Sequence, residues 1–279
     1  AFGGTIAGTP KILCAIDYWP TVTVQRTVAF ASDGAIYRDD LSASTWSSLV
    51  AGLSTAGSVP MFCLGGAESG TTNDRKLFFA DAINTPKVLR ADGAAMANIT
   101  NPPVDWATKK PRLFVVAEGF LLGAAGNTLY GSKLNDHEDF LSEPFTLAVG
   151  AGDEEYIAAA LSFKSGIVVW KYPQGVYYVQ TANIDRTLWF PSKVGSAGAS
   201  GPMNAVVTDN DVLWVSPSGT FHLLSTTQAH GAVKAEDILH RQLGNTWARD
   251  HLDLRRLNLA QMCWHGEKLQ AMLACVPAS

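Results

Sequence analysis

Charged side chains are scarce in this chain, since only 16% of its 279 residues are Asp, Glu, Lys or Arg. Ordinary soluble domains carry about 25%. The hydrophobic fraction of 47% is enough to bury a sizeable core. Two interpretations of the low charge stay open: a surface that faces other subunits, or a surface of Ser, Thr, Asn and Gly. The net charge of −4, without long Lys or Arg clusters, argues against a general nucleic-acid-binding surface.

Cysteine and histidine motifs for metal binding are also missing. The four cysteines, Cys14, Cys63, Cys263 and Cys275, lie far apart and form no CxxC pair. We interpret them as buried free thiols in a reducing compartment; a disulfide between Cys263 and Cys275 is conceivable but not indicated. No HxH or HExxH pair occurs among the six histidines, although His240 and His251 could meet in space; we therefore expect no metal site. The histidines are His137, His222, His230, His240, His251 and His265.

Long apolar runs, targeting signals and nucleotide-binding motifs are absent as well. No run reaches 18 apolar residues, so we predict no membrane span, and residues 1–4 lack the charged start of a signal peptide. No serine lies in a GxSxG elbow. The glycine-rich stretches Gly123–Gly126 and Gly150–Gly152 lack GK[ST] and a βαβ context, so we interpret them as turns. Because no Pro- or Ser-rich linker divides the chain, we expect one domain, residues 1–279.

The strongest feature that is present is a series of short apolar runs between turn residues. Tyr156–Phe163, Ile167–Trp170 and Val176–Val179 are rich in β-branched and aromatic residues, and Lys164–Gly166 and Pro173–Gly175 separate them. This pattern predicts a meander of antiparallel strands.

The same pattern returns about forty residues later. Asn204–Val207, Val212–Val215 and Thr220–Leu224 follow one another with polar turns between them. In both copies the second strand carries a tryptophan, Trp170 or Trp214. A recurring unit of this length is typical of a propeller blade, which cannot bury both its faces alone.

Weaker copies begin at Val28, Lys76 and Leu113, and an incomplete one covers Met262–Val276. We therefore predict an all-β fold, a β-propeller of about six antiparallel blades. One helical excursion is expected, because one face of a helix would carry these residues before a Gly244 stop: Ala232, Ala235, Leu239 and Leu243.

The final apolar strand, Leu269–Val276, has no later partner in the sequence. An unpaired apolar edge promotes aggregation. Either the natural protein continues beyond Ser279, or an early strand such as Lys11–Ile16 closes the last blade; we favour continuation.

Turn and aromatic landmarks follow one another in a specific order from about residue 25 to the end. They are Asp33–Gly34, Ile36–Tyr37, Trp46, Asn84–Pro86, Leu129–Ser132, Asp139–Phe140, Tyr156–Ile157, Val168–Lys171, Gly175–Tyr177, Leu213–Gly219 and Phe221. In this order the chain resembles the propeller-bearing tail proteins of bacteriophages, especially the nozzle or hub proteins of short-tailed phages at the head-to-tail passage.

That resemblance implies a structural protein of the virion tail, assembled in the host cytoplasm, and not an enzyme. It further implies a homo-oligomeric ring, expected to be a hexamer, in contact with other tail, portal and adaptor proteins. DNA would pass through in transit without sequence-specific binding. The resemblance implies no cofactor.

The acidic loop Asp136–Asp139, followed by Asp153–Glu155, is the best place in the sequence for chemistry. Paired carboxylates could cleave a glycoside or hold Ca²⁺, although no EF-hand spacing is present. Acid–base work requires the pKa values of the pair to be driven apart, which the sequence does not indicate. We interpret the loop as a solvated connection between blades and assign no catalytic, cofactor or metal residue.

Tryptophans could instead stack on sugars. Trp170 and Trp214 occupy equivalent places, which favours packing between blades, whereas Trp106 and Trp247 lie in loop-like sequence and are better contact candidates. For each we still expect packing; the others are Trp19, Trp46, Trp189 and Trp264. Two rival functions remain: a carbohydrate-binding or glycoside-cleaving propeller, and a WD-type scaffold, whose regular Gly-His and Trp-Asp marks are missing.

Overall fold

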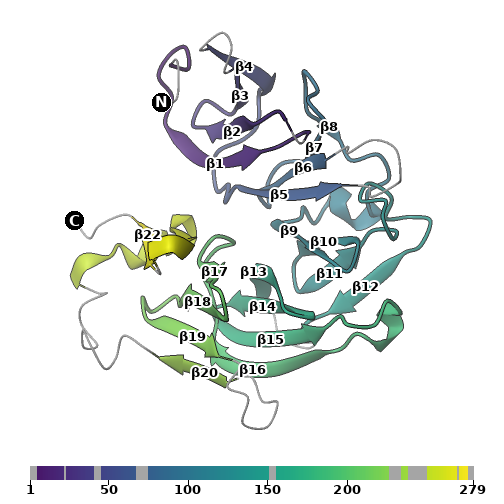
Figure 1. The fold of residues 1–279 in the computed structure, drawn as a ribbon, viewed down its shortest axis with the longest axis vertical. Helices are drawn as coiled ribbons and strands as arrows, with labels where there is room; N and C mark the ends of the chain where they lie inside the picture. Colours follow the sequence, from purple (N-terminus) through teal and green to yellow (C-terminus); the bar gives the residue numbers. More distant parts are fainter. Residues whose placement is uncertain are drawn as a thin grey trace. The chain divides into compact units, whose positions relative to one another are not determined.

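The computed structural model describes residues 5–21, 23–40, 45–66, 75–150, 155–225, 234–237, 250–268 and 270–275 (Figure 1). In this part of the chain β-strands dominate, and single 3₁₀ turns interrupt them. Among these residues no helix is long and apolar enough to cross a membrane.

Five sheets have four strands each, and strands that are consecutive in the sequence are neighbours in the sheet. The first sheet contains β1 (Ile12–Tyr18), β2 (Arg26–Ala31), β3 (Ile36–Asp40) and β4 (Thr45–Val50). The second contains β5 (Met61–Gly66), β6 (Arg75–Ala80), β7 (Lys87–Arg90) and β8 (Ala97–Asn98). The third contains β9 (Leu113–Ala117), β10 (Phe120–Ala125), β11 (Thr128–Gly131) and β12 (Phe145–Ala148).

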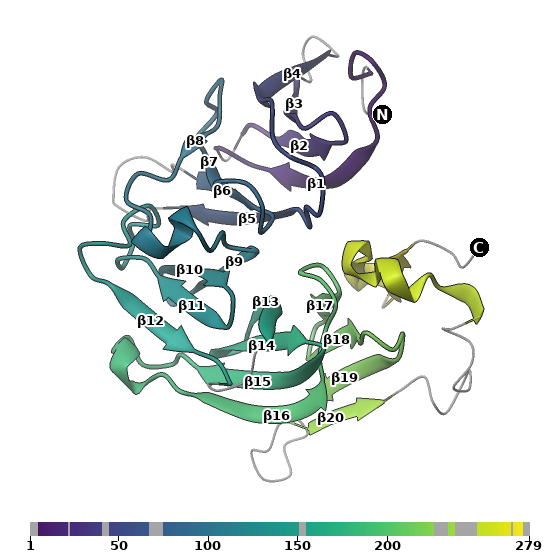
Figure 2. The same ribbon diagram turned by 180° about the vertical axis from the view of Figure 1, so that it is seen from behind.

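The later sheets continue in the same way (Figure 2). The fourth contains β13 (Tyr156–Phe163), β14 (Gly166–Tyr172), β15 (Gln174–Gln180) and β16 (Pro191–Ala197). The fifth contains β17 (Ala205–Val207), β18 (Asp211–Val215), β19 (Phe221–Ser225) and β20 (Lys234–Asp237). The described part of the sixth sheet is a pair, β21 (Gln261–His265) and β22 (Gln270–Ala274). The 3₁₀ turns are η1 (Val104–Ala107), η2 (Arg186–Leu188), η3 (Leu254–Leu259) and η4 (Gly266–Lys268).

The sheets belong to two compact units. One comprises Ala1–Ala125 and Tyr130–Thr146, and the other comprises Gly126–Leu129 and Leu147–Ser279. Within the first unit β1 contacts β5 and β5 contacts β9; within the second, β13 contacts β17 and β17 contacts β21. First strands that lie side by side in successive four-stranded meanders are the arrangement of propeller blades. The predicted all-β propeller with an incomplete last blade is confirmed; the single domain stays a prediction.

Tight turns explain why the strands are so short. The turn between β2 and β3 ends at Gly34, whose φ of 78° lies in the left-handed region that favours glycine. A Cβ at this position would lie 2.2 Å from the carbonyl oxygen of Leu53, so no larger residue fits.

The core of the first unit includes an aromatic cluster between the second and third sheets. Trp106, on η1, is 2% exposed, and its ring lies 4.8 Å from that of Phe140 and 5.7 Å from that of Phe114. Trp106 is therefore a packing residue, as expected, although its loop-like sequence had made it a better contact candidate than Trp170 or Trp214. The neighbouring Gly123 lies within β10, where a Cβ would come within 2.5 Å of the Trp106 ring. The expectation of a turn was therefore wrong for Gly123, which leaves space for the indole.

The core of the second unit lies between the fourth and fifth sheets. Trp170 on β14 and Trp214 on β18 are fully buried, with ring centroids 5.7 Å apart. Small residues such as Ala158 and Ala159 leave space beside them. Packing between blades, predicted from the equivalent places of these tryptophans, is confirmed.

One local prediction was wrong. Part of the expected helix, Lys234–Asp237, is strand β20, which pairs with β19; pairing along an available sheet edge overrides weak helix propensity. The other residues predicted for that helix lie outside the described residues. Ile12–Ile16 belongs to β1, which pairs with β2 of the first sheet; the two alternatives for the last blade stay predictions.

Candidate functional site

The acidic loop Asp136–Asp139 lies against the residues that follow the second sheet. The Asn101 amide donates to the carbonyl oxygen of Glu138 at 3.0 Å, and Asn101 forms a bridge with Asp139. His137, Glu138 and Asp139 are only 3%, 5% and 8% exposed. The loop joins β11 to β12 within the third sheet, so its interpretation as a connection between blades was wrong. Its interpretation as solvated was also wrong, because main-chain contacts with Asn101 bury it.

Glu138 is held by cations from the second sheet. Lys76 Nζ, on β6, lies 2.9 Å from its carboxylate, and Arg90, on β7, binds both carboxylate oxygens. Thr100 donates a further hydrogen bond at 3.0 Å. Burial by itself would raise the pKa of Glu138, but Arg90 and Lys76 outweigh burial and lower the pKa to about 2.

The two neighbours of Glu138 in the loop, His137 and Asp139, also have hydrogen-bond partners. Asp139 accepts hydrogen bonds from the amides of Leu141 and Ser142 at 3.1 Å, and the bonds with Ser142 lower the pKa of Asp139 to about 2. His137 Nδ1 accepts from the Gly66 amide at 3.1 Å, and Nε2 lies 3.1 Å from the Gly119 carbonyl oxygen, which assigns the proton to Nε2. A general acid needs a raised carboxyl pKa. This geometry therefore favours a structural role for the loop over acid–base chemistry.

A second carboxylate joins the first and second sheets in the same manner. Asp92, in the turn after β7, forms ion pairs with Arg26 from β2 and Arg38 from β3. In each pair a guanidinium nitrogen lies 2.8 Å from a carboxylate oxygen of Asp92. The hydrogen bond from Arg26 lowers the pKa of Asp92. Nearby, the Tyr18 hydroxyl donates to the Ala91 carbonyl oxygen at 2.8 Å.

These two contacts, which we call the Asp92 clasp and the Glu138 clasp, are built alike. In each, the second and third strands of one sheet supply one cation apiece, and the next sheet supplies the carboxylate. The loop of Glu138 was singled out from the sequence, whereas the Asp92 clasp was not, because its residues are separated by up to 66 positions.

No metal centre forms in the part of the chain that the structure describes: no three His, Cys, Asp or Glu residues there gather to hold an ion. His222 stacks on Trp214, with ring centroids 5.1 Å apart. Asp153, Glu154, His230, His240 and Trp247 lie outside the described residues, as do Ala151 and Gly152 of the second glycine-rich stretch.

All four cysteines are free. Cys14 is buried, as predicted, whereas Cys263 is exposed and Cys63 and Cys275 are half-buried. Burial raises the pKa of Cys14 and of Cys63 to about 12, so these two thiols stay protonated at neutral pH.

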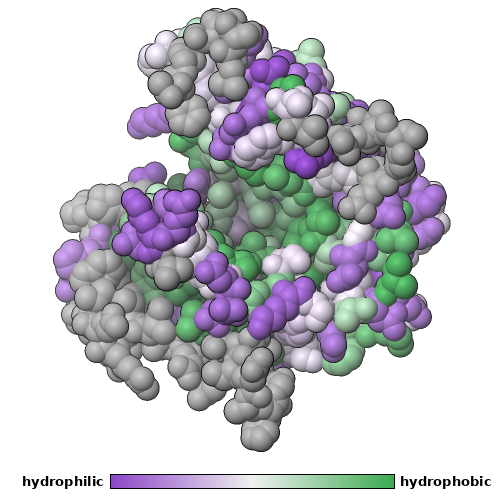
Figure 3. All heavy atoms as spheres, in the orientation of Figure 1, coloured by the Kyte–Doolittle hydropathy of each residue, from purple (hydrophilic) through white to green (hydrophobic). Residues whose placement is uncertain are grey.

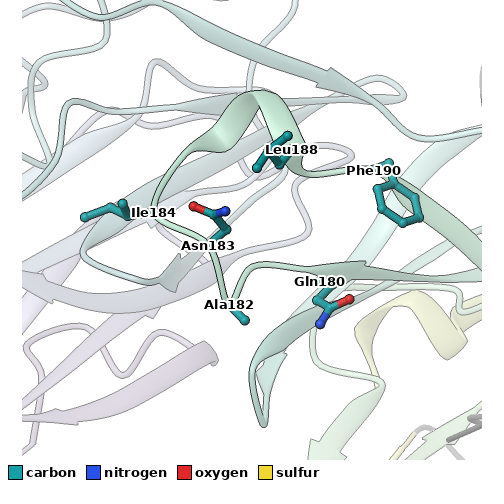
Figure 4. A pocket seen from close by; sticks show the side chains of 6 residues that line it. All are labelled: Gln180, Ala182, Asn183, Ile184, Leu188 and Phe190. Carbon is teal, nitrogen blue, oxygen red and sulfur yellow. The ribbon is translucent and has the colours of Figure 1, made fainter.

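An exposed apolar surface lies on the segment between β15 and β16, residues 181–190, which we call the apolar loop. Ile184, Leu188 and Phe190 are 63%, 57% and 61% exposed. In close-up Leu188 lies above Asn183, with Ile184 and Phe190 at opposite ends (Figure 4). A pocket of about 530 Å³ is lined by Gln180, Ala182, Asn183, Ile184, Leu188 and Phe190. The space-filling view also shows hydrophobic residues at the surface over this segment (Figure 3).

Internal hydrogen bonds hold the apolar loop in shape. Buried Trp189 donates from Nε1 to the Asn183 carbonyl oxygen at 2.6 Å, and Asp185 accepts from the Thr187 amide at 3.0 Å and from its hydroxyl at 2.7 Å. The three apolar side chains therefore point outward from a fixed backbone. This surface was not predicted from the sequence; its signal was Leu188–Phe190, an apolar run that begins three residues after the capping Asp185.

Comparisons with known proteins add little about function. No family model matches the chain, and no curated protein sequence is significantly similar to it. Among solved structures, it is similar to BBS1N in complex with ARL6DN, in crystals soaked with mercury or with lead. Both show a TM-score of 0.49 at 11% identity and cover 81% and 82% of this chain and 69% of the other. At this TM-score the likeness supports no functional inference.

Proposed function

We propose that this protein is a structural subunit of a bacteriophage tail, a nozzle or hub protein that forms a ring around the DNA passage. The observation that carries the proposal is the order in which the phage-like landmarks follow one another along successive blades. Asp33–Gly34 forms the turn before β3, and Trp170 and Trp214 occupy the second strands of the fourth and fifth sheets.

The physical character of the molecule supports this role. Strands pair within each sheet, and aromatic side chains and clasps join neighbouring sheets inside a unit. Such a molecule resists deformation, as a load-bearing ring requires. A ring needs heterologous contacts between subunits, and a low content of charge at the surface suits them.

The rival function is a glycoside-cleaving propeller, and the carboxylates that would best serve it are engaged in structural contacts. Its general acid would need a raised pKa, but Glu138 is held ionised by Lys76 and Arg90, and Asp139 caps its own turn. No specific observation favours the carbohydrate function over the structural one.

The test is size analysis of the purified chain, alone and mixed with the tail and portal proteins of its virion. We expect annular particles of several subunits in electron micrographs, or incorporation into tails. A chain that stays monomeric in every mixture, and that hydrolyses glycans, would contradict the proposal in favour of the carbohydrate-active alternative.

A further inference from the structure

We propose that the apolar loop, residues 181–190, is a contact through which a second copy of this chain binds. This inference rests on the proposed ring and names the surface by which one subunit meets the next. Its three outward side chains, Ile184, Leu188 and Phe190, occur within seven residues.

The area of the patch matches the centre of a subunit interface. At exposures of 57% to 63%, these side chains present on the order of 300 Å² of apolar surface. A stable interface buries roughly 800 Å² on each partner, with an apolar centre and a polar rim. The patch is thus large enough for such a centre. The exposed polar residues around it, on the same segment and the adjoining strands β15 and β16, are Gln180, Asn183, Asp185 and Lys193.

The pocket favours a protein surface over a small ligand. A small molecule is bound with about 70–90% of its surface buried, whereas the apolar side chains here are themselves more than half exposed. No charged side chain lines the pocket, so the occupant contributes an uncharged apolar group.

A copy of the same chain can approach this surface without strong repulsion. The net charge is only −4 over 279 residues, so charge repulsion between two copies is weak. In a ring, a heterologous contact places the same patch of every subunit against a different face of its neighbour. The loop would then be covered in every copy, and its internal hydrogen bonds would keep it in the binding shape before contact.

The test compares the oligomeric state of three full-length variants with that of the wild type by sedimentation over a concentration series. The first is Leu188→Ser with Phe190→Ser, and the second is Ile184→Arg at the opposite end of the pocket. The matched control is Val104→Ser, which removes an 81% exposed apolar side chain from η1. We expect both loop variants to weaken association at least tenfold, with thermal unfolding unchanged because the side chains are exposed, while Val104→Ser associates like the wild type.

The outcomes separate the two proposals. If the wild type assembles and the loop variants assemble equally well, the contact is elsewhere and this inference is overturned, while the ring proposal stands. If the wild type is monomeric at every concentration and with the other tail proteins, the ring and the contact both fail. Selective loss of assembly in the two loop variants supports both.

Discussion

Asn204 has no exposed surface, and its side chain uses both its acceptor and its donors. Oδ1 accepts from the Ser200 amide at 3.0 Å, and Nδ2 donates to the carbonyl oxygens of Leu257 and Ala260 at 2.9 and 2.8 Å. One side chain therefore joins the start of the fifth sheet to η3. Nothing in the local sequence distinguishes it from a turn asparagine, since the two acceptors of its amide group are more than fifty residues away.

The substitution Asn204→Asp tests this role. It replaces a donor by an oxygen that faces two carbonyl oxygens, and we expect the free energy of unfolding to fall by about 2–3 kcal/mol at neutral pH. Urea denaturation monitored by tryptophan fluorescence measures the change. Asn98→Asp is the control, because Asn98 is exposed and its Oδ1 accepts from Lys87 Nζ, as a carboxylate also would. Equal stability of the Asn204→Asp protein and the wild type would refute the assignment.

Glu138→Gln tests the Glu138 clasp. The variant leaves Lys76 and Arg90 without their carboxylate, and we expect a loss of about 2 kcal/mol of stability, below the cost for a fully buried pair because Arg90 is 43% exposed. Glu118→Gln, an exposed carboxylate in the turn after β9, should change stability by less than about 0.5 kcal/mol. Denaturation at pH 7 distinguishes the two.

The pH dependence of stability follows from the same pair. Since the folded protein lowers the pKa of Glu138 to about 2, its contribution is present above the ordinary glutamate pKa of 4.5 and is lost as pH falls toward 2. Stability of the wild type should therefore fall more steeply than that of Glu138→Gln between these values. Parallel curves would show that the ion pair contributes nothing.

At the scale of whole elements, neighbouring sheets are joined in two different ways. In the first unit, aromatic packing is supplemented by the two clasps. In the second unit, Trp170 and Trp214 fill the space between β14 and β18, and Trp214 Nε1 also donates to the Ala197 carbonyl oxygen of β16 at 3.1 Å. Trp170 Nε1 is buried without a partner.

Trp214 Nε1 has a hydrogen-bond partner and Trp170 Nε1 has none. We therefore expect replacement by Phe to lower stability by different amounts at the two positions. Trp214→Phe loses packing and a hydrogen bond and leaves a carbonyl unpaired, so it should destabilise more than Trp170→Phe, by about 1 kcal/mol. The double variant should show a coupling of about 1 kcal/mol, because the two rings touch. A double-mutant cycle by urea denaturation measures both. Strict additivity, or a larger cost for Trp170→Phe, would contradict the packing described.

At the scale of the whole molecule, thiol reactivity reports how the fold protects its interior. Cys263 is exposed, whereas Cys14 is 2% exposed and its pKa is raised to about 12. Because the thiolate is the reactive form, a thiol reagent at pH 8 should modify Cys263 fastest in the native protein and Cys14 only on unfolding. Cys263→Ser should remove the fastest phase. Rapid modification of Cys14 in the native state would show that the first sheet opens easily.

The sequence predicted the blades better than their junctions. The second and third strands of each sheet carry dense β-branched and aromatic runs next to turn residues, and they were located well. The first strand of the second sheet, Met61–Gly66, and outer strands such as Pro191–Ala197 were missed, because they are less regular in pattern. Packing was expected for Trp106, but its partners were not predicted, because sequence neighbours such as Pro102 do not show that η1 turns the indole into the core.

The sequence by itself determined that this chain forms a succession of short antiparallel sheets, because strand propensity, alternation and turn residues are local properties. Only the tertiary structure decided what the acidic loop does and which apolar residues stay outside. The charge state of Glu138 depends on Lys76 and Arg90, and the exposure of Phe190 depends on how Trp189 is buried beside it. Such relations join residues that are distant in the chain or point in opposite directions, and they exist only once the backbone has folded.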